Sequence, residues 1–272
     1  MTRLPLAYSD AGPADDPEPI ILLHGYPLDR TMWDETAAHL VSQGRRIIRP
    51  DLRGHGLSPV VFEASTMERC ADDVLGLANN LGIGRFRLGG FSLGGYVALE
   101  LIRRQAERVA GLLLVDTRAD PDSPEGQKKR DAAIARIRAE GMSPIADEMM
   151  PKLLSDLSRR RQPELEARVR RMITATLPQG AMNAVEGMRD RPDQRPHLGA
   201  IRVPTLIVVG AEDKLTPLDA AMVMQKAIPG AQVRIVTNAA HLTPLEAPEP
   251  FNHFLDHWVK GTIPKTLGGM RA

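Results

Sequence analysis

One serine stands in a pattern that can make its hydroxyl reactive. Ser92 lies in the run GFSLGG at residues 90–95, which follows the strand-like segment RFRLGG and opens the helical segment GGYVALELIRR. A turn that joins a strand directly to a helix strains its central residue, so the neighbours two positions away must lack side chains. Glycine at both positions meets this requirement. The pattern predicts a nucleophilic serine at a helix N-terminus, whose dipole favours negative charge.

A serine hydroxyl needs a base to remove its proton. Of the seven histidines, His241 lies in NAAHLTPLEAPE, after the last apolar run and before the final helical pattern. Enzymes with a serine in such a turn carry the acid and then the histidine further along the chain, which fits this place. His24 precedes a glycine at a strand end and His55 lies inside DLRGHGLS, so both are interpreted as loop-shaping residues. We predict His241 as the base.

Two aspartates can orient this histidine. Asp213 lies in VVGAEDKLTP, ahead of the last apolar run, and Asp116 ends an earlier run in LLLVDTRAD. Either carboxylate would hold the imidazole in one tautomer and stabilise its charged form. Asp213 is favoured because its loop is the commoner source of the acid. The alternative interpretation of Asp116 is a residue that closes a strand end.

A carbonyl oxygen that gains negative charge needs two backbone donors. The first predicted donor is the amide of Leu93, directly after the serine. The second is the amide of Tyr26, in the loop after His24-Gly25. Pro27 has no amide hydrogen, so we expect it to fix the path of this loop and to narrow the pocket beside the serine.

Short apolar runs alternate with helical patterns, which predicts an α/β fold with a mostly parallel sheet and helices on both faces. The predicted strands are residues 4–8, 19–23, 45–50, 85–89, 111–116, 204–210 and 232–237, and the predicted helices are residues 31–42, 66–81, 94–104, 217–227 and 248–260. Several strand runs are apolar at successive positions, as strands buried on both faces should be.

Residues 121–197 break this alternation, because they hold helical patterns and no convincing strand. We predict that they form a helical lid (cap) over the C-terminal edge of the sheet, where ligands bind in open α/β sheets. Residues 1–120 and 198–272 then make up the core domain. The lid has no aromatic Phe, Tyr or Trp but six methionines, whose flexible side chains suit packing first and substrate contact second. The residues predicted to line the substrate pocket are Pro27, Phe91, Met142, Met149, Leu215 and Leu242.

The amino-acid composition limits the kinds of binding partner that we expect. Lys and Arg number 35 against 34 Asp and Glu, a net charge of +1, which gives no reason to expect nucleic acid or a membrane. The chain shows no signal-peptide pattern or membrane span, and its single cysteine, Cys70, fits a reducing cytoplasm. We expect a cytoplasmic enzyme without metal or organic cofactor, because no ligand cluster, phosphate loop or dinucleotide fingerprint appears. Whether it forms a homodimer stays open.

The chain resembles the α/β-hydrolase superfamily along nearly its whole length. The resemblance rests on HGYP at 24–27, DLRGHGLS at 51–58, GFSLGG at 90–95, GAEDKLTP at 210–217 and AAHLTPLEAPE at 239–249. Within the superfamily, the chain most resembles small bacterial carboxylesterases, cofactor-free haloperoxidase (perhydrolase)-like enzymes and 3-oxoadipate enol-lactonases.

This resemblance implies an α/β-hydrolase fold with a helical lid inserted after the sixth core strand of that fold. It implies a serine hydrolase that cleaves small carboxylic esters or lactones through an acyl-serine intermediate, with Ser92, Asp213 and His241 as the triad. Because perhydrolase-like members show an aromatic residue followed by proline, as Tyr26-Pro27 does here, peracid formation from hydrogen peroxide is expected as a side activity. A hydroxynitrile lyase, a thioesterase and a slow-turnover ligand receptor stay open as alternatives, since one scaffold hosts many reactions.

Overall fold

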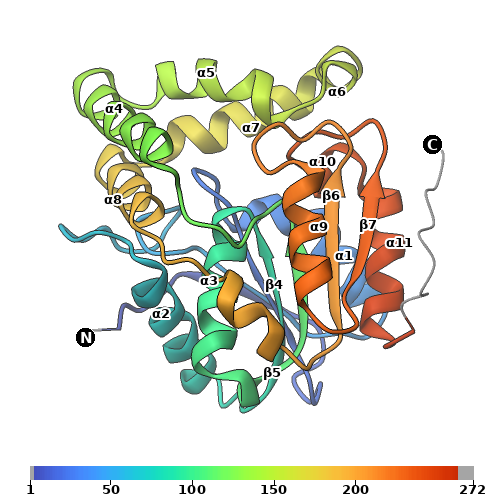
Figure 1. Ribbon diagram of the computed structural model, residues 1–272. Coiled ribbons are helices and arrows are strands. Elements are labelled where there is room, and N and C mark those ends of the chain that lie inside the picture. Colours follow the sequence, from blue (N-terminus) through green and yellow to red (C-terminus); the bar gives the residue numbers. More distant parts are fainter. Residues whose placement is uncertain (1–2, 263–272) are drawn as a thin grey trace.

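Seven strands form one sheet in the computed structural model, which describes residues 3–262 (Figure 1). The strands are β1 (Tyr8–Ala11), β2 (Ile20–Leu23), β3 (Ile47–Pro50), β4 (Phe86–Phe91), β5 (Val109–Val115), β6 (Thr205–Gly210) and β7 (Gln232–Val236). Their order across the sheet is β1-β3-β2-β4-β5-β6-β7. Strand β1 runs antiparallel to β3, and all other neighbours are parallel. The predicted α/β fold with a mostly parallel sheet is confirmed.

The sheet is an inner layer because its strands are apolar at successive positions. Every residue of β2 and β5 is buried, as expected for parallel strands covered on both faces. Helices α1 (Asp34–Ser42) and α11 (Pro248–Val259) pack against each other on one face (Figure 1). Helices α2 (Met67–Asn80) and α3 (Leu93–Arg104) cover the other face, and α9 (Leu218–Ala227) packs on β6 and β7. None of the helices within residues 3–262 combines the length and the apolar character needed to cross a bilayer.

The strand order reverses at β2. From β2 the chain crosses to β3 on one side and then returns to β4 on the other, so the connections after β2 and β4 leave the sheet in opposite directions. In open α/β sheets, ligands bind in the crevice at such a reversal, outside the carboxyl ends of the strands. The loop at residues 24–29 and Ser92 start from the two strands that flank this crevice.

A helical insertion separates β5 from β6 and lies over the upper edge of the sheet in Figure 1. It contains α4 (Pro124–Glu140), α5 (Ser143–Leu153), α6 (Asp156–Arg161), α7 (Pro163–Ala175) and α8 (Pro178–Arg189). The 3-10 helix η3 (Arg195–Ala200) follows these helices and packs against α9. No residue from 121 to 197 lies in a strand. The lid is expected after the sixth core strand, but the insertion follows β5, the fifth strand in the described part of the chain. The difference arises because a single strand precedes β2 among the described residues.

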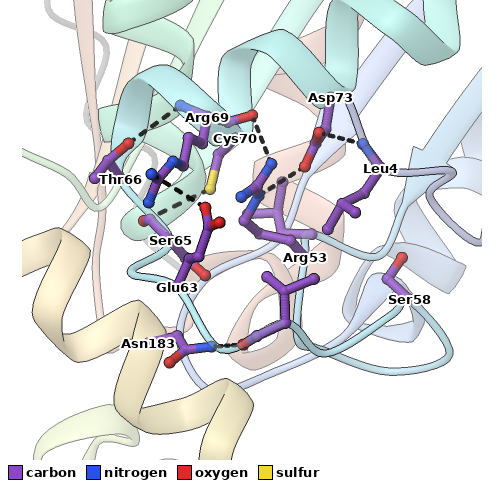
Figure 2. Close-up of polar contacts among 12 residues, drawn as sticks. Leu4, Arg53, Ser58, Glu63, Ser65, Thr66, Arg69, Cys70, Asp73 and Asn183 are labelled. Carbon is purple, nitrogen blue, oxygen red and sulfur yellow. Dashed lines mark hydrogen bonds and ion pairs between the residues drawn. The ribbon is translucent and has the colours of Figure 1, made fainter. Parts of the chain in front are cut away.

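The first strand begins later than predicted. The sequence predicts a strand at residues 4–8, whereas β1 covers Tyr8–Ala11. The amide of Leu4 donates to the Asp73 carboxylate on α2 at 2.7 Å, and the amide of Ala7 donates to the Ser58 hydroxyl at 2.9 Å. Because side chains take up these amides, the segment before Tyr8 is held against α2 and the loop at residues 51–58 (Figure 2).

That loop is itself fixed to α2 by a buried ion pair. The Arg53 guanidinium donates to the Asp73 carboxylate at 2.7 Å, with both side chains almost fully buried (Figure 2). Removing one partner of a buried pair leaves an uncompensated charge, which is strongly destabilising. The pair therefore fixes the loop that also carries His55, two residues after Arg53.

Two glycines of α8 bring the insertion into direct backbone contact with the core. A Cβ atom on Gly180 would lie 1.9 Å from the Gly54 carbonyl oxygen, and a Cβ atom on Gly187 would lie 1.9 Å from the Ser65 carbonyl oxygen. Between them, the Asn183 carbonyl accepts the Ser65 amide at 2.9 Å, and its side-chain amide donates to a carbonyl of the same loop (Figure 2). Helix α8 thus docks on the segment that precedes α2.

We expect Gly180→Ala to destabilise the fold, because the added methyl group meets a backbone carbonyl that cannot move aside cheaply. The expected loss is about 1–3 kcal/mol in the free energy of unfolding, measured as a lower midpoint in urea denaturation. Gly199→Ala is the control, since the nearest atom to its added Cβ lies 3.9 Å away. Equal midpoints for the two variants would contradict the role assigned to the α8 contact.

Candidate active site

The backbone of Ser92 is strained because β4 passes into α3 without a loop. Its φ of 50° and ψ of −112° lie outside the regions that L residues normally adopt. A Cβ atom on Gly90 would lie 2.2 Å from the Gly94 carbonyl oxygen, and one on Gly94 would lie 2.4 Å from the Leu23 carbonyl oxygen. Glycine is therefore required at both positions, for the turn itself and for the close approach of α3 to β2.

Three side chains from distant parts of the sequence meet at this turn. The Nε2 atom of His241 lies 3.0 Å from Ser92 Oγ, and its Nδ1 atom lies 2.8 Å from Asp213 Oδ2. Asp213 follows β6 and His241 follows β7, so neighbouring parallel strands bring both to the edge where β4 ends. The side chains of His241 and Asp213 are buried and Ser92 is half-buried. Among these three side chains, only that of Ser92 is partly exposed to solvent.

The Asp213 carboxylate is held by several donors besides the histidine. Its Oδ1 atom accepts from the amides of Leu215 (2.8 Å) and Thr216 (3.0 Å), and its Oδ2 atom accepts from the Thr216 hydroxyl (2.6 Å). Burial raises the pKa of Asp213, but His241 and the donors from Thr216 outweigh burial and hold this pKa below its ordinary value. An ionised Asp213 favours the imidazole tautomer with its proton on Nδ1, which leaves Nε2 free to accept the serine proton.

Asp116, the alternative acid, has other partners. It is fully buried and accepts from the Gly210 amide (2.9 Å) and from the amide and hydroxyl of Thr243 (3.3 and 2.5 Å). Burial and the nearby charge of Asp213 raise the pKa of Asp116 well above its ordinary value. It links the end of β5 to β6 and to α10 (Thr243–Glu246), and none of its hydrogen bonds within residues 3–262 reaches the histidine. The geometry favours Asp213 as the histidine's partner.

The loop after β2 packs directly against the serine turn. A Cβ atom on Gly25 would lie 2.5 Å from the Phe91 ring and 3.2 Å from Ser92 Cβ. In the described part of the chain, the amides of Tyr26 and Leu93 donate to no other protein group. Two amides near Ser92 therefore remain available for a negatively charged oxygen, which is consistent with the pair of donors predicted from the sequence.

His24 and His55 support this loop. The Nε2 atom of His24 accepts from the Leu52 amide at 2.8 Å, and its Nδ1 atom donates to the Gly25 carbonyl at 2.9 Å. The His55 ring packs on the His24 ring, with centroids 5.1 Å apart, and on the Tyr26 ring. Burial lowers the pKa of His24 to about 4 and that of His55 to about 3. Both rings are therefore neutral near pH 7 and act as fixed supports.

Three of the predicted pocket residues lie beside the triad. The Phe91 ring packs on the His241 ring with centroids 5.0 Å apart, Leu215 binds the acid through its amide, and Leu242 directly follows the histidine. Phe91 and Leu242 are fully buried, and substrate contact by these three residues stays a prediction.

The other three predicted pocket residues lie toward the insertion. The Pro27 carbonyl accepts from the Thr176 hydroxyl, just after α7, at 2.9 Å. Met142, next to α5, is a buried core residue, and Met149, within α5, packs against that core. Substrate contact by these side chains stays a prediction.

The sequence patterns do not predict two residues that contribute to the site. The hydroxyl of Thr216 shares the carboxylate of Asp213 with the histidine, and a threonine three residues after an aspartate is a recognisable signal for such a local hydrogen-bonded turn. Glu246 binds the amides that flank His241. A glutamate in a short helix carries no comparable signal.

Other reactive residues do not form a rival site. Cys70 is buried in α2, and burial raises the pKa of its thiol to about 12, so it stays protonated. Within residues 3–262, no three His, Cys, Asp or Glu side chains are grouped as ligands for a metal ion.

The chain is similar to known proteins along most of its length. A family model described as the alpha/beta hydrolase family matches residues 20–254. Among curated proteins, 3-oxoadipate enol-lactonase 1 of Acinetobacter baylyi is 30% identical over 249 residues, which cover 92% of this chain and 91% of that protein.

Two solved structures extend this similarity. An esterase from Thermogutta terrifontis, solved with malate bound, superposes with a TM-score of 0.91 at 42% identity, over 95% of this chain and 94% of that one. The enol-lactonase from Burkholderia xenovorans LB400 superposes with a TM-score of 0.87 at 30% identity, over 94% of this chain and 96% of that one.

The two acids can be separated by isosteric substitution. We expect Asp213→Asn to lower kcat for p-nitrophenyl acetate by about four decades, because the amide favours the wrong imidazole tautomer. Asp116→Asn should keep a rate close to that of the wild type, since the hydrogen bonds of Asp116 go to Gly210 and Thr243 and not to the histidine. A rate loss in Asp116→Asn with Asp213→Asn unaffected, in two equally folded proteins, would assign the acid to Asp116.

Proposed function

The chain belongs to the alpha/beta hydrolase family and is a carboxylic ester hydrolase, and from this premise we propose that it cleaves small esters or lactones through an acyl intermediate on Ser92. The observation that carries the proposal is the unbroken contact from Ser92 Oγ through His241 to the Asp213 carboxylate. A hydroxyl held in this way can lose its proton as it attacks, which an isolated serine cannot do at neutral pH.

In the first half of the proposed reaction, Ser92 Oγ attacks the carbonyl carbon while His241 Nε2 takes its proton. The carbonyl oxygen becomes negative and is bound by the amides of Tyr26 and Leu93 at the N-terminus of α3, whose dipole also favours negative charge. Collapse of this intermediate breaks the bond to the alcohol oxygen, which receives the proton from His241. The acyl group remains on Ser92; in a lactone the alcohol stays attached to it.

The second half repeats these steps with water. His241 takes a proton from the water molecule as the water oxygen attacks the acyl carbon. The same two amides bind the oxyanion, and the bond to Ser92 Oγ breaks as this oxygen regains its proton from His241. The products are a carboxylic acid and the free enzyme, so no cofactor is consumed.

The substrate class follows from the relatives and from the insertion. Two of the similar proteins are named enol-lactonases and another is named an esterase. The chain from residue 97 to residue 250 contains no Phe, Tyr or Trp, so the apolar side chains that it can contribute to a pocket are aliphatic or methionine. We propose small esters or lactones with flexible aliphatic acyl groups, and peracid formation from hydrogen peroxide as a side activity.

Replacement of the nucleophile tests the mechanism. We expect Ser92→Ala to lower kcat by about 10⁴- to 10⁶-fold and to abolish covalent labelling by a fluorophosphonate. Ser42→Ala, at an exposed serine of α1, is the matched control and should label and turn over like the wild type. Retention of most activity by Ser92→Ala would exclude the acyl-serine route.

A substrate panel tests the class. We expect p-nitrophenyl acetate and butyrate to give higher kcat/KM than p-nitrophenyl benzoate, because the insertion at residues 121–197 supplies no Phe, Tyr or Trp that could stack on a flat acyl ring. Cyanide release from mandelonitrile would instead indicate a lyase, and faster cleavage of acyl-thioesters than of oxygen esters would indicate a thioesterase. A single turnover without recycling would indicate a receptor.

A further inference from the structure

A buried glutamate joins the histidine loop to the helical insertion. Glu246 ends α10, and 6% of it is exposed. Its Oε1 atom accepts from the amides of Ala240 (2.8 Å) and Leu242 (3.2 Å), the residues on either side of His241. Its Oε2 atom accepts from the Ser155 amide at 2.7 Å, at the junction between α5 and α6. One carboxylate therefore binds three buried amides from two parts of the molecule.

The same junction also binds the histidine residue directly. The carbonyl of Leu153, at the end of α5, accepts from the amides of His241 and Leu242, both at 3.1 Å. The Ser155 hydroxyl donates to the Asn238 carbonyl at 3.2 Å. All three consecutive amides from residue 240 to residue 242 are thus engaged, by Glu246 and by the insertion.

We infer that Glu246 is a positioning residue for the proposed base: it fixes the backbone on both sides of His241 and ties that backbone to Ser155 of the insertion. A carboxylate suits this task because it only accepts hydrogen bonds and offers two oxygens. Its bonds to amides are charge-assisted and stronger than neutral ones. The inference rests on the proposed function, since it concerns the residue proposed to take the serine proton.

Catalysis should be sensitive to this arrangement because the imidazole must satisfy two contacts at once. His241 Nε2 lies 3.0 Å from the serine oxygen while Nδ1 lies 2.8 Å from Asp213. A small rotation of the backbone at residue 241 lengthens one or both contacts. Misplacement of a catalytic group by about 1 Å can cost about a hundredfold in rate.

Glu246→Gln tests the inference with almost no change in shape. The amide group has one acceptor oxygen, so its NH₂ group must face either the Ser155 amide or the amides of Ala240 and Leu242. We expect kcat per folded active site, and the rate of fluorophosphonate labelling, to fall about ten- to a hundredfold, with KM little changed. Both rates depend on the placement of the base, whereas general destabilisation lowers the number of folded sites and leaves the rate per site unchanged.

Glu100→Gln is the matched control. Glu100 lies in α3, away from the histidine loop, and 2% of it is exposed. Its carboxylate accepts hydrogen bonds from Gln194 and Arg103. Its substitution by glutamine therefore also alters a buried carboxylate but does not touch the histidine loop. We expect wild-type kcat per folded site in Glu100→Gln. A Glu246→Gln protein that keeps the wild-type rate per site would overturn the inference.

A second pair of variants tests the link to the insertion and does not require Glu246→Gln to fold. Ser155 has φ −62° and ψ 154°, and the preceding residue is extended, so proline fits this backbone. Ser155→Pro removes both the amide donor and the hydroxyl, whereas Ser155→Ala removes the hydroxyl alone. We expect a lower kcat and slower labelling in Ser155→Pro than in Ser155→Ala, and equal rates would contradict the link.

The labelling experiment also separates the failure of this inference from failure of the proposed function. If the wild type is not labelled at Ser92, the acyl-serine mechanism is wrong and the inference falls with it. If the wild type is labelled and Glu246→Gln is labelled at the same rate, the mechanism stands and only the role of Glu246 is refuted.

Discussion

Strand β4 enters helix α3 at one residue with positive φ, and the packing around the site follows from that turn. Strain of this kind costs about 1–3 kcal/mol and persists only where the surroundings enforce it. The packing of α3 holds the backbone of Ser92 in this conformation. Residues 93–102 of α3 are all buried, and the glycines at 90 and 94 let the helix lie against β2. The packing of one helix thus holds a serine in a conformation that the isolated chain would avoid.

The parallel sheet then explains how residues 92, 213 and 241 come together. Each follows the carboxyl end of a strand, and parallel strands place those ends on one edge. The insertion covers the same edge (Figure 1), so the buried histidine packs between the sheet and a layer of helices. That layer also contributes directly to the site, because carbonyl and amide groups near residues 153–155 bind the histidine loop.

Much of this arrangement could be predicted from the sequence, for physical reasons that differ between its parts. Strands buried on both faces produce unmistakable apolar runs, and the glycines around Ser92 mark a turn that tolerates little else. The first strand begins later than predicted because the amides of Leu4 and Ala7 donate to Asp73 and Ser58. A contact between residues distant in the sequence leaves no local pattern. For the same reason, the hydrogen bonds that separate Asp213 from Asp116 as the partner of His241 appear only in the fold. The sequence likewise gives no sign that Glu246 binds the amides beside His241.

The neighbouring acids at the ends of β5 and β6 bear on the electrostatics of proton transfer. In the proposed reaction, an imidazolium formed at His241 lies beside the Asp213 carboxylate, whose pKa is held below its ordinary value, whereas the hydrogen bonds of Asp116 go to Gly210 and Thr243. The histidine and its acid then form a pair with no net charge at the moment the proton moves. Such a pair requires little reorganisation of solvent, which suits a location that water barely reaches.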